Sequence, residues 1–249
     1  MKTEPTPERI QKVLSRAGVG SRRQIETWIK GGRIKINGKP AQLGDHISSD
    51  DKVKLDNRSI RLADQSQEKT RVLAYYKPSG EICARSDPKH KKTVFDSLPK
   101  LKSGRWINIG RLDINTIGLL LFTNDGEFAN QLMHPSNQVE REYAVRVLGK
   151  ASESQLQTLQ KGVKLEDGQA HFTDIVAAGG EGVNQWYHVV ILEGRNREVR
   201  RLWESQGLKV SRLMRVRFGS YILPRSKHPG NFWDLDESEL KLLRKEVQN

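Results

Sequence analysis

The 249-residue sequence has little cysteine: Cys83 is the single one, which excludes an internal disulfide framework. Its six histidines are scattered and show neither CxxC nor HExxH spacing, so we expect no structural metal site. A catalytic role for Cys83 is conceivable in principle, but no nucleophile signature surrounds it. We therefore favour an ordinary thiol at this position.

Long hydrophobic runs are also absent. The apolar runs are short, as in residues 119–122, whereas a membrane-spanning helix needs about 20 residues. The first residues, MKTEPTPERIQ, contain no apolar signal-peptide core, so we expect a cytoplasmic protein. No basic helix with an aromatic-rich apolar face is evident, which argues against a peripheral membrane protein.

Acidic residues are outnumbered. The sequence has 43 Lys and Arg against 30 Asp and Glu, a formal net charge of +13. The first 64 residues carry +6 of this charge and the remaining 185 carry +7, so the N-terminal part has the higher charge density. Such a balance predicts a polyanionic partner, with nucleic acid first and an anionic membrane second.

Residues 7–62 carry the pattern of a small module of two helices and a hairpin. Apolar residues at 10, 13, 14 and 17 form the stripe of one helix. Ser21 and Gln24 form a capping box for a second helix, which ends at residues 31–32. Residues 33–36 alternate as a strand and precede Asn37-Gly38, a strong hairpin signal. Further short strands are predicted at 52–55 and 59–62.

Basic side chains gather on or beside this second helix and the hairpin. They are Arg16, Arg22, Arg23, Lys30, Arg33 and Lys35. A solvated helix face is one interpretation, because Lys and Arg are nearly always exposed. Few acids are interspersed here, so we favour a surface that contacts phosphates.

The segment RIQKVLSRAGVGSRRQIETWIKGGRIKINGKPAQLGDHI is similar to the S4 domain, a small RNA-binding unit of ribosomal protein S4 and several RNA-modifying enzymes. The SRR triplet, the double glycine and the NGK hairpin occur in the expected order. The resemblance implies binding of structured RNA through phosphates and shape. Residues 63–70 are polar and aperiodic, which predicts a linker.

Residues 71–249 form the second predicted domain, in which strands outnumber helices. We expect an exposed loop or short hairpin at 85–105, and the remaining strands at 71–76, 105–113, 118–123, 139–148, 184–193 and 209–218. We expect helices at 124–134, 152–162, 196–206 and 237–247. The strands mostly succeed one another like hairpins, which predicts an α+β fold with a large mixed or antiparallel sheet.

The segment GRLDINTIGLLLFTNDG carries the strongest chemical signal. It places Asp113 beside Arg111 in a glycine-bounded turn between two apolar strands. By itself the spacing favours a turn aspartate that bonds its own backbone.

This segment resembles motif II of the pseudouridine synthases, in the branch that includes the small-subunit rRNA enzyme. YYKPSGEICARSDP, MHPSNQVEREYAVRV and LEGRNREVRRLWESQGLKVSRLMRVRFG resemble the flanking motifs of that branch. GGEGVNQWYHVVILEGRNREVRRLWE is most similar to members acting on large-subunit rRNA. The resemblance implies isomerisation of one uridine of 23S rRNA near the peptidyl-transferase centre, in free rRNA or an assembling subunit, by a monomer without metal or redox cofactor.

The resemblance also implies roles for individual residues. Asp113 corresponds to the essential aspartate, which attacks the sugar or the base or removes a ribose proton; the sequence does not choose among these. Tyr143 corresponds to the tyrosine that stacks on the target base, although by itself a strand tyrosine indicates a core position. Arg200 corresponds to the arginine that pairs with the aspartate and keeps it ionised.

Further basic residues are assigned to RNA binding. Lys77 in the KP motif and Arg111 are expected near substrate phosphates, and Arg195 and Arg197 are expected to contact RNA. The runs 89–92 and Arg212, Arg215 and Arg217 would extend this basic surface, although a solvated position is the default for each. A non-catalytic RNA-binding or ribosome-assembly protein with the same fold is the alternative function; the intact GRLD, EREY and EVRR elements favour the enzyme.

Overall fold

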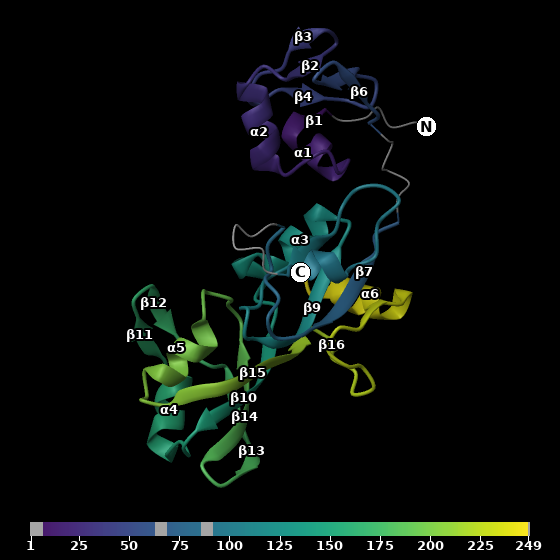
Figure 1. Cartoon of the computed structure of the whole chain (residues 1–249). Helices are drawn as coiled ribbons and strands as arrows, with labels where there is room; N and C mark the ends of the chain where they lie inside the picture. Colours follow the sequence, from purple (N-terminus) through teal and green to yellow (C-terminus); the bar gives the residue numbers. More distant parts are fainter. Residues whose placement is uncertain (1–6, 63–68, 86–91, 249) are drawn as a thin grey trace. The chain divides into compact units, whose positions relative to one another are not determined.

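The computed structural model describes residues 7–62, 69–85 and 92–248. The chain divides into two compact units (Figure 1). One comprises the residues up to Thr70 together with Pro99–Trp106 and Asn124–Gly126, and the other comprises the remaining residues from Arg71 onward. The predicted linker at 63–70 and the basic run at 89–92 lie largely outside the described residues.

The N-terminal unit contains the two predicted helices, α1 (Ile10–Arg16) and α2 (Arg22–Lys30). The side chain of Ser21 accepts from the backbone N–H of Gln24, and the Gln24 side chain accepts from the backbone N–H of Ser21, so the capping box is confirmed. Apolar side chains of both helices pack on a small sheet and form one core.

That sheet has the strand order β3-β2-β5-β6, and a separate pair joins β1 to β4. The strands are β1 (Glu8–Arg9), β2 (Ile34–Ile36), β3 (Lys39–Pro40), β4 (His46–Ile47), β5 (Val53–Leu55) and β6 (Arg58–Ile60). Asn37 and Gly38 both have positive φ angles, +50° and +89°, as the predicted hairpin turn requires.

The larger unit is built on a nine-stranded sheet with the order β13-β14-β10-β15-β9-β7-β17, to which β16 and β8 add at β15 and β9. All pairs are antiparallel except β15 with β9. The strands are β7 (Val72–Lys77), β8 (Ile107–Ile109), β9 (Ile117–Thr123), β10 (Arg141–Leu148), β13 (Asp174–Glu181), β14 (Asn184–Ile191), β15 (Lys209–Phe218), β16 (Tyr221–Ile222) and β17 (Phe232–Asp234). The predicted α+β fold with a large mixed sheet is confirmed.

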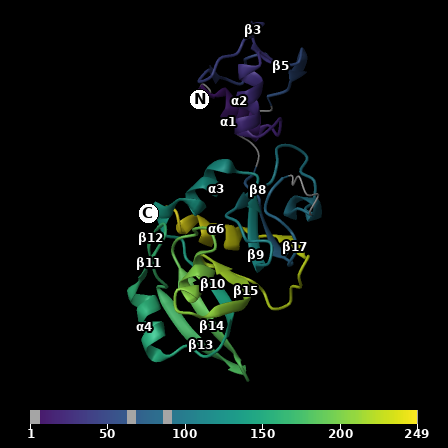
Figure 2. The same ribbon diagram turned by 60° about the vertical axis from the view of Figure 1, so that its left-hand side comes forward.

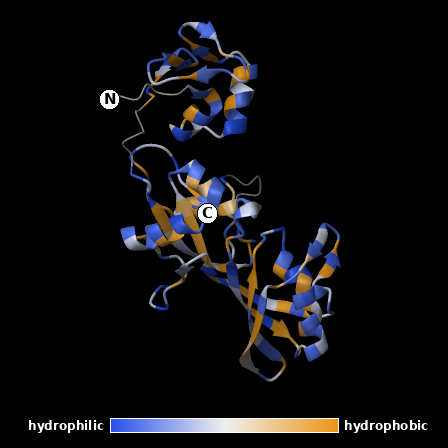
Figure 3. Ribbon diagram, turned by 180° about the vertical axis from the view of Figure 1, so that it is seen from behind, coloured by the Kyte–Doolittle hydropathy of each residue, from blue (hydrophilic) through white to orange (hydrophobic). Residues whose placement is uncertain are grey.

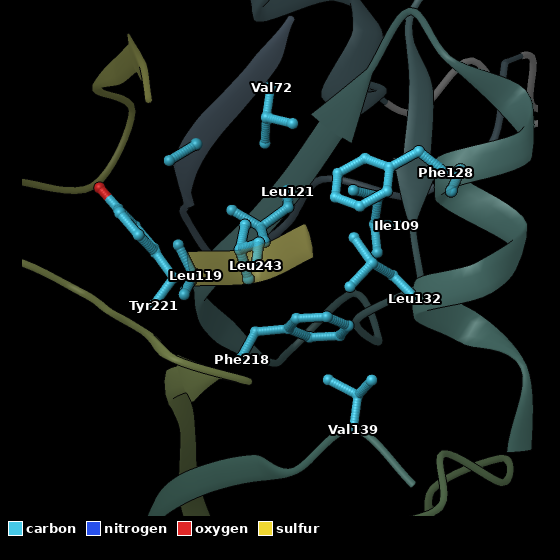
Figure 4. Close-up of a cluster of buried hydrophobic side chains, with 12 residues drawn as sticks. Val72, Ile109, Leu119, Leu121, Phe128, Leu132, Val139, Phe218, Tyr221 and Leu243 are labelled. Carbon is cyan, nitrogen blue, oxygen red and sulfur yellow. The ribbon is translucent and has the colours of Figure 1, made fainter. Parts of the chain in front are cut away.

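Helices cover parts of this sheet and complete two apolar regions. The helices are α3 (Gly126–Met133), α4 (Glu153–Lys161), α5 (Glu198–Glu204) and α6 (Glu237–Lys245). Side chains of α3 and α6 meet β7, β8 and β9 in a core that includes Phe128, Leu121 and Leu243 (Figure 4). Near α4 and α5, Trp203 contacts Tyr187 and Phe172 at ring-centre distances of 4.8 and 5.9 Å.

Hydropathy follows this arrangement. In Figure 3 the central strands are mostly orange, whereas helices alternate between orange and blue. No helix among the described residues is long and apolar enough to cross a bilayer.

The structure differs from the sequence prediction at several elements. The hairpin of β11 (Val163–Leu165) and β12 (Gly168–Ala170), and the strands β13, β16 and β17, were not predicted. Nearly all of β13 is exposed, so it lacks the buried-exposed alternation that identifies a strand. In the predicted loop at 85–105, the described part contains a short 3₁₀ helix, Val94–Ser97, with Val94 buried. Arg215 was expected on the basic surface, but this side chain is 1% exposed.

Candidate active site

A pocket of about 840 Å³ opens in the larger unit where the β8–β9 connection meets β10, β15 and the segment before α5. The side chains of Asp113, Arg111 and Tyr143 line it, together with those of Arg195 and Arg197. Five of the predicted site residues, which are up to 86 positions apart, therefore share one cavity.

The loop between β8 and β9 presents Asp113. The Thr116 backbone N–H donates to the Asp113 carbonyl oxygen at 3.0 Å, which closes a turn directly after the aspartate. Asp113 is half-buried, whereas Arg111 is exposed on the pocket rim. The loop ends where β9 begins at Ile117, and Ile117 and Gly118 pair with Met214 and Arg215 of β15.

Gly118 has a φ of +106°, and a Cβ atom built on it would lie 2.3 Å from the Arg215 carbonyl oxygen. Both the backbone conformation and the close approach require glycine at this position. Packing therefore explains why Gly118 ends the GRLDINTIG segment: the absence of a side chain allows β15 to pair with β9 beside the Asp113 loop.

Lys77 holds the same loop through hydrogen bonds to backbone carbonyl oxygens. Its ammonium group donates to the carbonyl oxygens of Pro78, Ile114 and Thr116 at 3.0, 3.3 and 2.9 Å. The side chain is 0% exposed, and burial lowers its pKa against the opposing electrostatic influence of Cys83, Glu81 and Asp113. All three donors are used in this structure, which supports a role of Lys77 in holding the Asp113 loop; the phosphate contact stays a prediction.

Tyr143 lies in the middle of the sheet on β10, opposite Val189 of β14 and Arg215 of β15. It is 7% exposed and its side chain lines the pocket. Tyr143 is therefore both a buried residue of the strand and part of the pocket wall. The stacking role stays a prediction.

Arg200 on α5 is buried but does not line the pocket. Its Nη1 donates to the Val210 carbonyl at 3.1 Å, and its Nε has no partner among the described residues. Burial and the charge of Arg197 lower its pKa, while the carboxylate of Asp113 acts in the opposite direction. The two groups interact electrostatically, but no ion pair within 4 Å joins them in the described part of the chain.

Arg195 and Arg197 flank the start of α5. Arg195 is paired with Glu193 at 2.5 Å and Asp167 at 3.6 Å, so its charge is largely compensated within the protein. Arg197 has a left-handed backbone, with a φ of +50°, and an exposed 3.4 Å contact to Glu204. Arg197 therefore presents the more available of the two charges at the pocket mouth.

The three arginines of the N-terminal unit that were predicted to contact RNA differ in whether an acidic side chain of the protein pairs with them. Arg33 forms an ion pair with Asp56, whose pKa is lowered by it, and lies 5.4 Å from the Trp28 ring centre. Arg22 and Arg23 at the start of α2 are exposed and have no acidic partner within 4 Å among the residues described.

Three further residues line the pocket but were not predicted to lie there. Arg215 donates from Nε to the Leu119 carbonyl at 2.7 Å, while its buried Nη2 has no partner among the described residues. Arg141 donates to the Leu192 carbonyl, and burial lowers its pKa. The carboxylate of Glu198 is buried and accepts from the Arg195 backbone N–H at 3.0 Å. The motif strings contain all three, but an isolated strand arginine gives no sequence signal of burial.

Cys83 lines the same pocket. Its sulfur accepts from the Leu112 backbone N–H at 3.4 Å, and burial raises its pKa, which keeps it a thiol at neutral pH. This supports the interpretation as an ordinary thiol. Across residues 7–62, 69–85 and 92–248, no group of three or more His, Cys, Asp or Glu side chains is arranged to hold a metal ion.

Comparisons with known proteins identify the family of each unit. Residues 71–205 match the RNA pseudouridylate synthase family, and residues 8–53 match the S4 domain. One solved structure, a pseudouridylate synthase, has the same fold, with a TM-score of 0.66 at 24% identity over 94% of this chain and 99% of that one.

Curated relatives are more similar in sequence. Ribosomal large subunit pseudouridine synthase B of Salmonella typhi is 56% identical over 95% of this chain and 82% of its own length, and that of Escherichia coli is 54% identical over 97% and 84%. The Pseudomonas aeruginosa protein of the same name is 56% identical over 98% of this chain, which spans 63% of that relative. By the family match and by these relatives, the chain belongs to the RNA pseudouridylate synthase family.

Proposed function

We propose that the protein isomerises a uridine of ribosomal RNA to pseudouridine in the pocket that contains Asp113 and Tyr143. The observation that carries this proposal is the pocket itself, which brings together the carboxylate, the aromatic ring and several cations. The names of the relatives support large-subunit rRNA as the substrate. Within it, we propose one uridine of 23S rRNA near the peptidyl-transferase centre as the target. The protein acts in the cytoplasm as a monomer.

The reaction needs no external atoms. The C1′–N1 glycosidic bond breaks, the uracil turns within the pocket, and C5 bonds to C1′. The proton on C5 then leaves and N1 gains one, so atoms and electrons balance. Asp113 supplies the carboxylate, as a nucleophile on sugar or base or as a base toward a ribose proton.

The target nucleotide must leave its helix or stack to reach the pocket, at a cost of a few kcal/mol. Stacking on Tyr143 returns part of that cost, about 1–3 kcal/mol. The Tyr143 hydroxyl is also suited to receive the C5 proton. Arg111 and Arg197 at the pocket rim are positioned to hold the flanking phosphates.

An ionised carboxylate is essential in each of these mechanisms. Arg200 interacts electrostatically with the Asp113 carboxylate, and Arg215 and Arg141 add buried positive charge to the same pocket. We propose that substrate binding brings the Arg200 guanidinium, whose Nε has no partner among the described residues, into direct contact with Asp113.

The substitution Asp113→Asn tests the proposal. The amide keeps the shape but cannot act as a base or nucleophile, so we expect turnover to fall at least about 10²-fold, as general acid–base groups typically contribute 10²–10⁴-fold. RNA affinity should stay near wild type. Pseudouridine formation in a 23S rRNA transcript, mapped by carbodiimide labelling and reverse transcription, measures both the activity and the target uridine.

A non-catalytic RNA-binding protein is the alternative. It would bind the transcript but leave no pseudouridine in it, and wild-type protein and Asp113→Asn would then be indistinguishable in the same assay. Activity of Asp113→Asn within tenfold of an active wild type would contradict the assigned role.

A further inference from the structure

The strands β10, β14 and β15 have two faces of different character. One face carries Tyr187, which packs against Trp203 of α5, and also Tyr143, which lines the pocket. In Figures 1 and 2, α4 and α5 lie on one side of these strands. The residues between these buried positions point to the opposite side, which no described helix covers at this end of the sheet.

Three residues form a row across this uncovered face, which we call the outer row. Arg146 of β10 lies directly opposite Trp186 of β14 on one side and Arg212 of β15 on the other. Trp186 and Arg146 are half-buried and Arg212 is exposed. The pairing register places this row on the face opposite Tyr143 and Arg215, and hence away from the pocket.

The two arginines are an unusual pair. Like charges directly opposite each other on neighbouring strands repel. Arg146 donates from Nε to the Ser211 hydroxyl at 3.0 Å, and its guanidinium lies 5.9 Å from the Trp186 ring centre. In the described part of the chain, neither Arg146 nor Arg212 has a carboxylate within 4 Å. Solvent or an external anion must therefore reduce the repulsion between the two guanidinium groups.

Neighbouring charges do not neutralise the outer row. Lys209, one row further along β15, is exposed and adds a third cation. The Glu142 carboxylate of the same face is engaged by His188 and Arg217 at 2.7 and 2.8 Å. Glu181, at the tip of the β13–β14 hairpin and opposite Asn184, lies in the same neighbouring row as Lys209 and offsets that one charge, which leaves the two arginines of the outer row. This end of the face keeps an excess of positive charge.

An RNA strand has the complementary chemistry. A phosphodiester can accept from two guanidinium groups at once, and an unstacked base can lie on an exposed indole ring. A row that places a tryptophan beside two arginines offers both contacts to adjacent parts of one nucleotide segment. An acidic protein segment would satisfy the arginines but would leave the ring without a specific partner.

We propose that the outer row binds a second segment of the RNA substrate, with a phosphate at Arg146 and Arg212 and a base on Trp186. This contact lies outside the pocket and is independent of catalysis. It extends the RNA-binding surface of the enzyme to the back of its sheet.

The test uses full-length protein and an unmodified 23S rRNA transcript as the probe. In the double variant Arg146→Ala with Arg212→Ala, the slope of log affinity against log salt should be smaller in magnitude by about 0.7–0.9, the value for the loss of one neutralised phosphate. The affinity should fall several-fold, while kcat at saturating RNA stays at the wild-type value.

Matched variants separate a specific contact from loss of charge or of folding. Arg225→Ala with Arg244→Ala removes two exposed cations elsewhere in the same unit and should leave the slope unchanged. Arg146→Lys with Arg212→Lys keeps the charge and should restore the slope. Trp186→Phe should bind nearly as well as wild type, whereas Trp186→Ala should bind more weakly with an unaltered slope.

Two outcomes would overturn the proposal. One is a wild-type salt slope in the Arg146 and Arg212 double alanine variant, as expected if this face binds a protein or only solvent. The other is an equal loss in the Arg225 and Arg244 control. Because the readout is affinity, it remains interpretable whether or not the transcript is the natural substrate for isomerisation.

Discussion

At the scale of single residues, Glu198 shows how burial at the pocket disfavours the ionised form of a carboxyl group. Burial raises the pKa of its carboxyl above the ordinary value of 4.5. In the unfolded chain the group ionises freely, whereas in the folded chain ionisation is disfavoured. Stability is therefore lost as pH rises from about 4.5 through the higher folded pKa, and the loss persists above it.

We predict that Glu198→Gln stabilises the protein at neutral pH. Glutamine cannot ionise, and its amide oxygen can still accept from the Arg195 backbone N–H. The melting temperature should rise near pH 7 by about 2–4 °C for each kcal/mol of penalty removed, with little change near pH 4. Calorimetry of wild type and variant at both pH values measures this, and an equal shift at both would contradict the electrostatic explanation.

Lys77 gives a second prediction, which separates a structural role from an RNA contact. Lys77→Met fills the same buried volume but leaves the carbonyls of Ile114 and Thr116 without their donor. Each buried carbonyl left unsatisfied costs about 1–3 kcal/mol. The free energy of unfolding should fall accordingly, and kcat should fall because the Asp113 loop loses its anchor.

The salt dependence of RNA binding should stay unchanged in Lys77→Met. If Lys77 contacted a phosphate, the slope would instead decrease in magnitude by about 0.7–0.9. Denaturant titration and binding at several salt concentrations, on the same preparation, distinguish the two roles.

At the scale of elements, the junction of β9 with β15 depends on a single glycine. Gly118→Ala would place a Cβ atom 2.3 Å from the Arg215 carbonyl oxygen at a φ of +106°. We expect it to destabilise the protein by more than about 2 kcal/mol, since strained backbone and overpacking cost 1–3 kcal/mol each. Activity should fall as well, because Gly118 lies at the start of β9, directly after the Asp113 loop.

Gly207→Ala is the matched control. Gly207 also has a positive φ, +71°, but nothing lies within 4 Å of its added Cβ. This variant should show the backbone cost alone, about 1–2 kcal/mol. Chemical unfolding of both variants tests the comparison, and equal losses would mean that the contact with β15 does not matter.

Elements with a strong local pattern could be predicted from the sequence, and those without one could not. The predicted span of β15, residues 209–218, is the observed one, and the capping box of α2 was predicted from Ser21 and Gln24. β13 was missed because residues 177–180 are small and exposed, and its pairing with β14 is a tertiary property.

In the candidate site, too, some residues could be predicted from the sequence and others could not. Motif resemblance pointed to Asp113 and Tyr143, which the structure places in one pocket, although their chemical roles remain predictions. Arg215 could not be recognised, because its burial depends on the Leu119 carbonyl, 96 positions away. The hydrogen bonds of Lys77 to the carbonyl oxygens of Pro78, Ile114 and Thr116 could not be predicted either, because they depend on the folded Asp113 loop.

At the scale of the whole molecule, the N-terminal part has the higher charge density, whereas the predicted chemistry lies in the larger unit. The predicted catalytic residues are all in the larger unit, whereas the first 64 residues carry almost half of the net charge of +13. We expect the N-terminal unit to supply RNA affinity that is the same for substrate and transition state. Such uniform binding affects KM and leaves kcat unchanged.

The exposed arginines Arg22 and Arg23 allow this division to be tested without removing the unit. Neither has an acidic partner among the described residues, whereas Arg33 is already paired with Asp56. Arg22→Ala with Arg23→Ala should reduce the salt slope by about 1.4–1.8 and raise KM several-fold at constant kcat, because two phosphate contacts are lost. Arg33→Ala should change the slope less. Steady-state kinetics on a 23S rRNA fragment at two salt concentrations, with folding checked by circular dichroism, give both quantities. A fall in kcat at unchanged KM would mean that the N-terminal unit helps to build the active site, since uniform binding cannot produce that pattern.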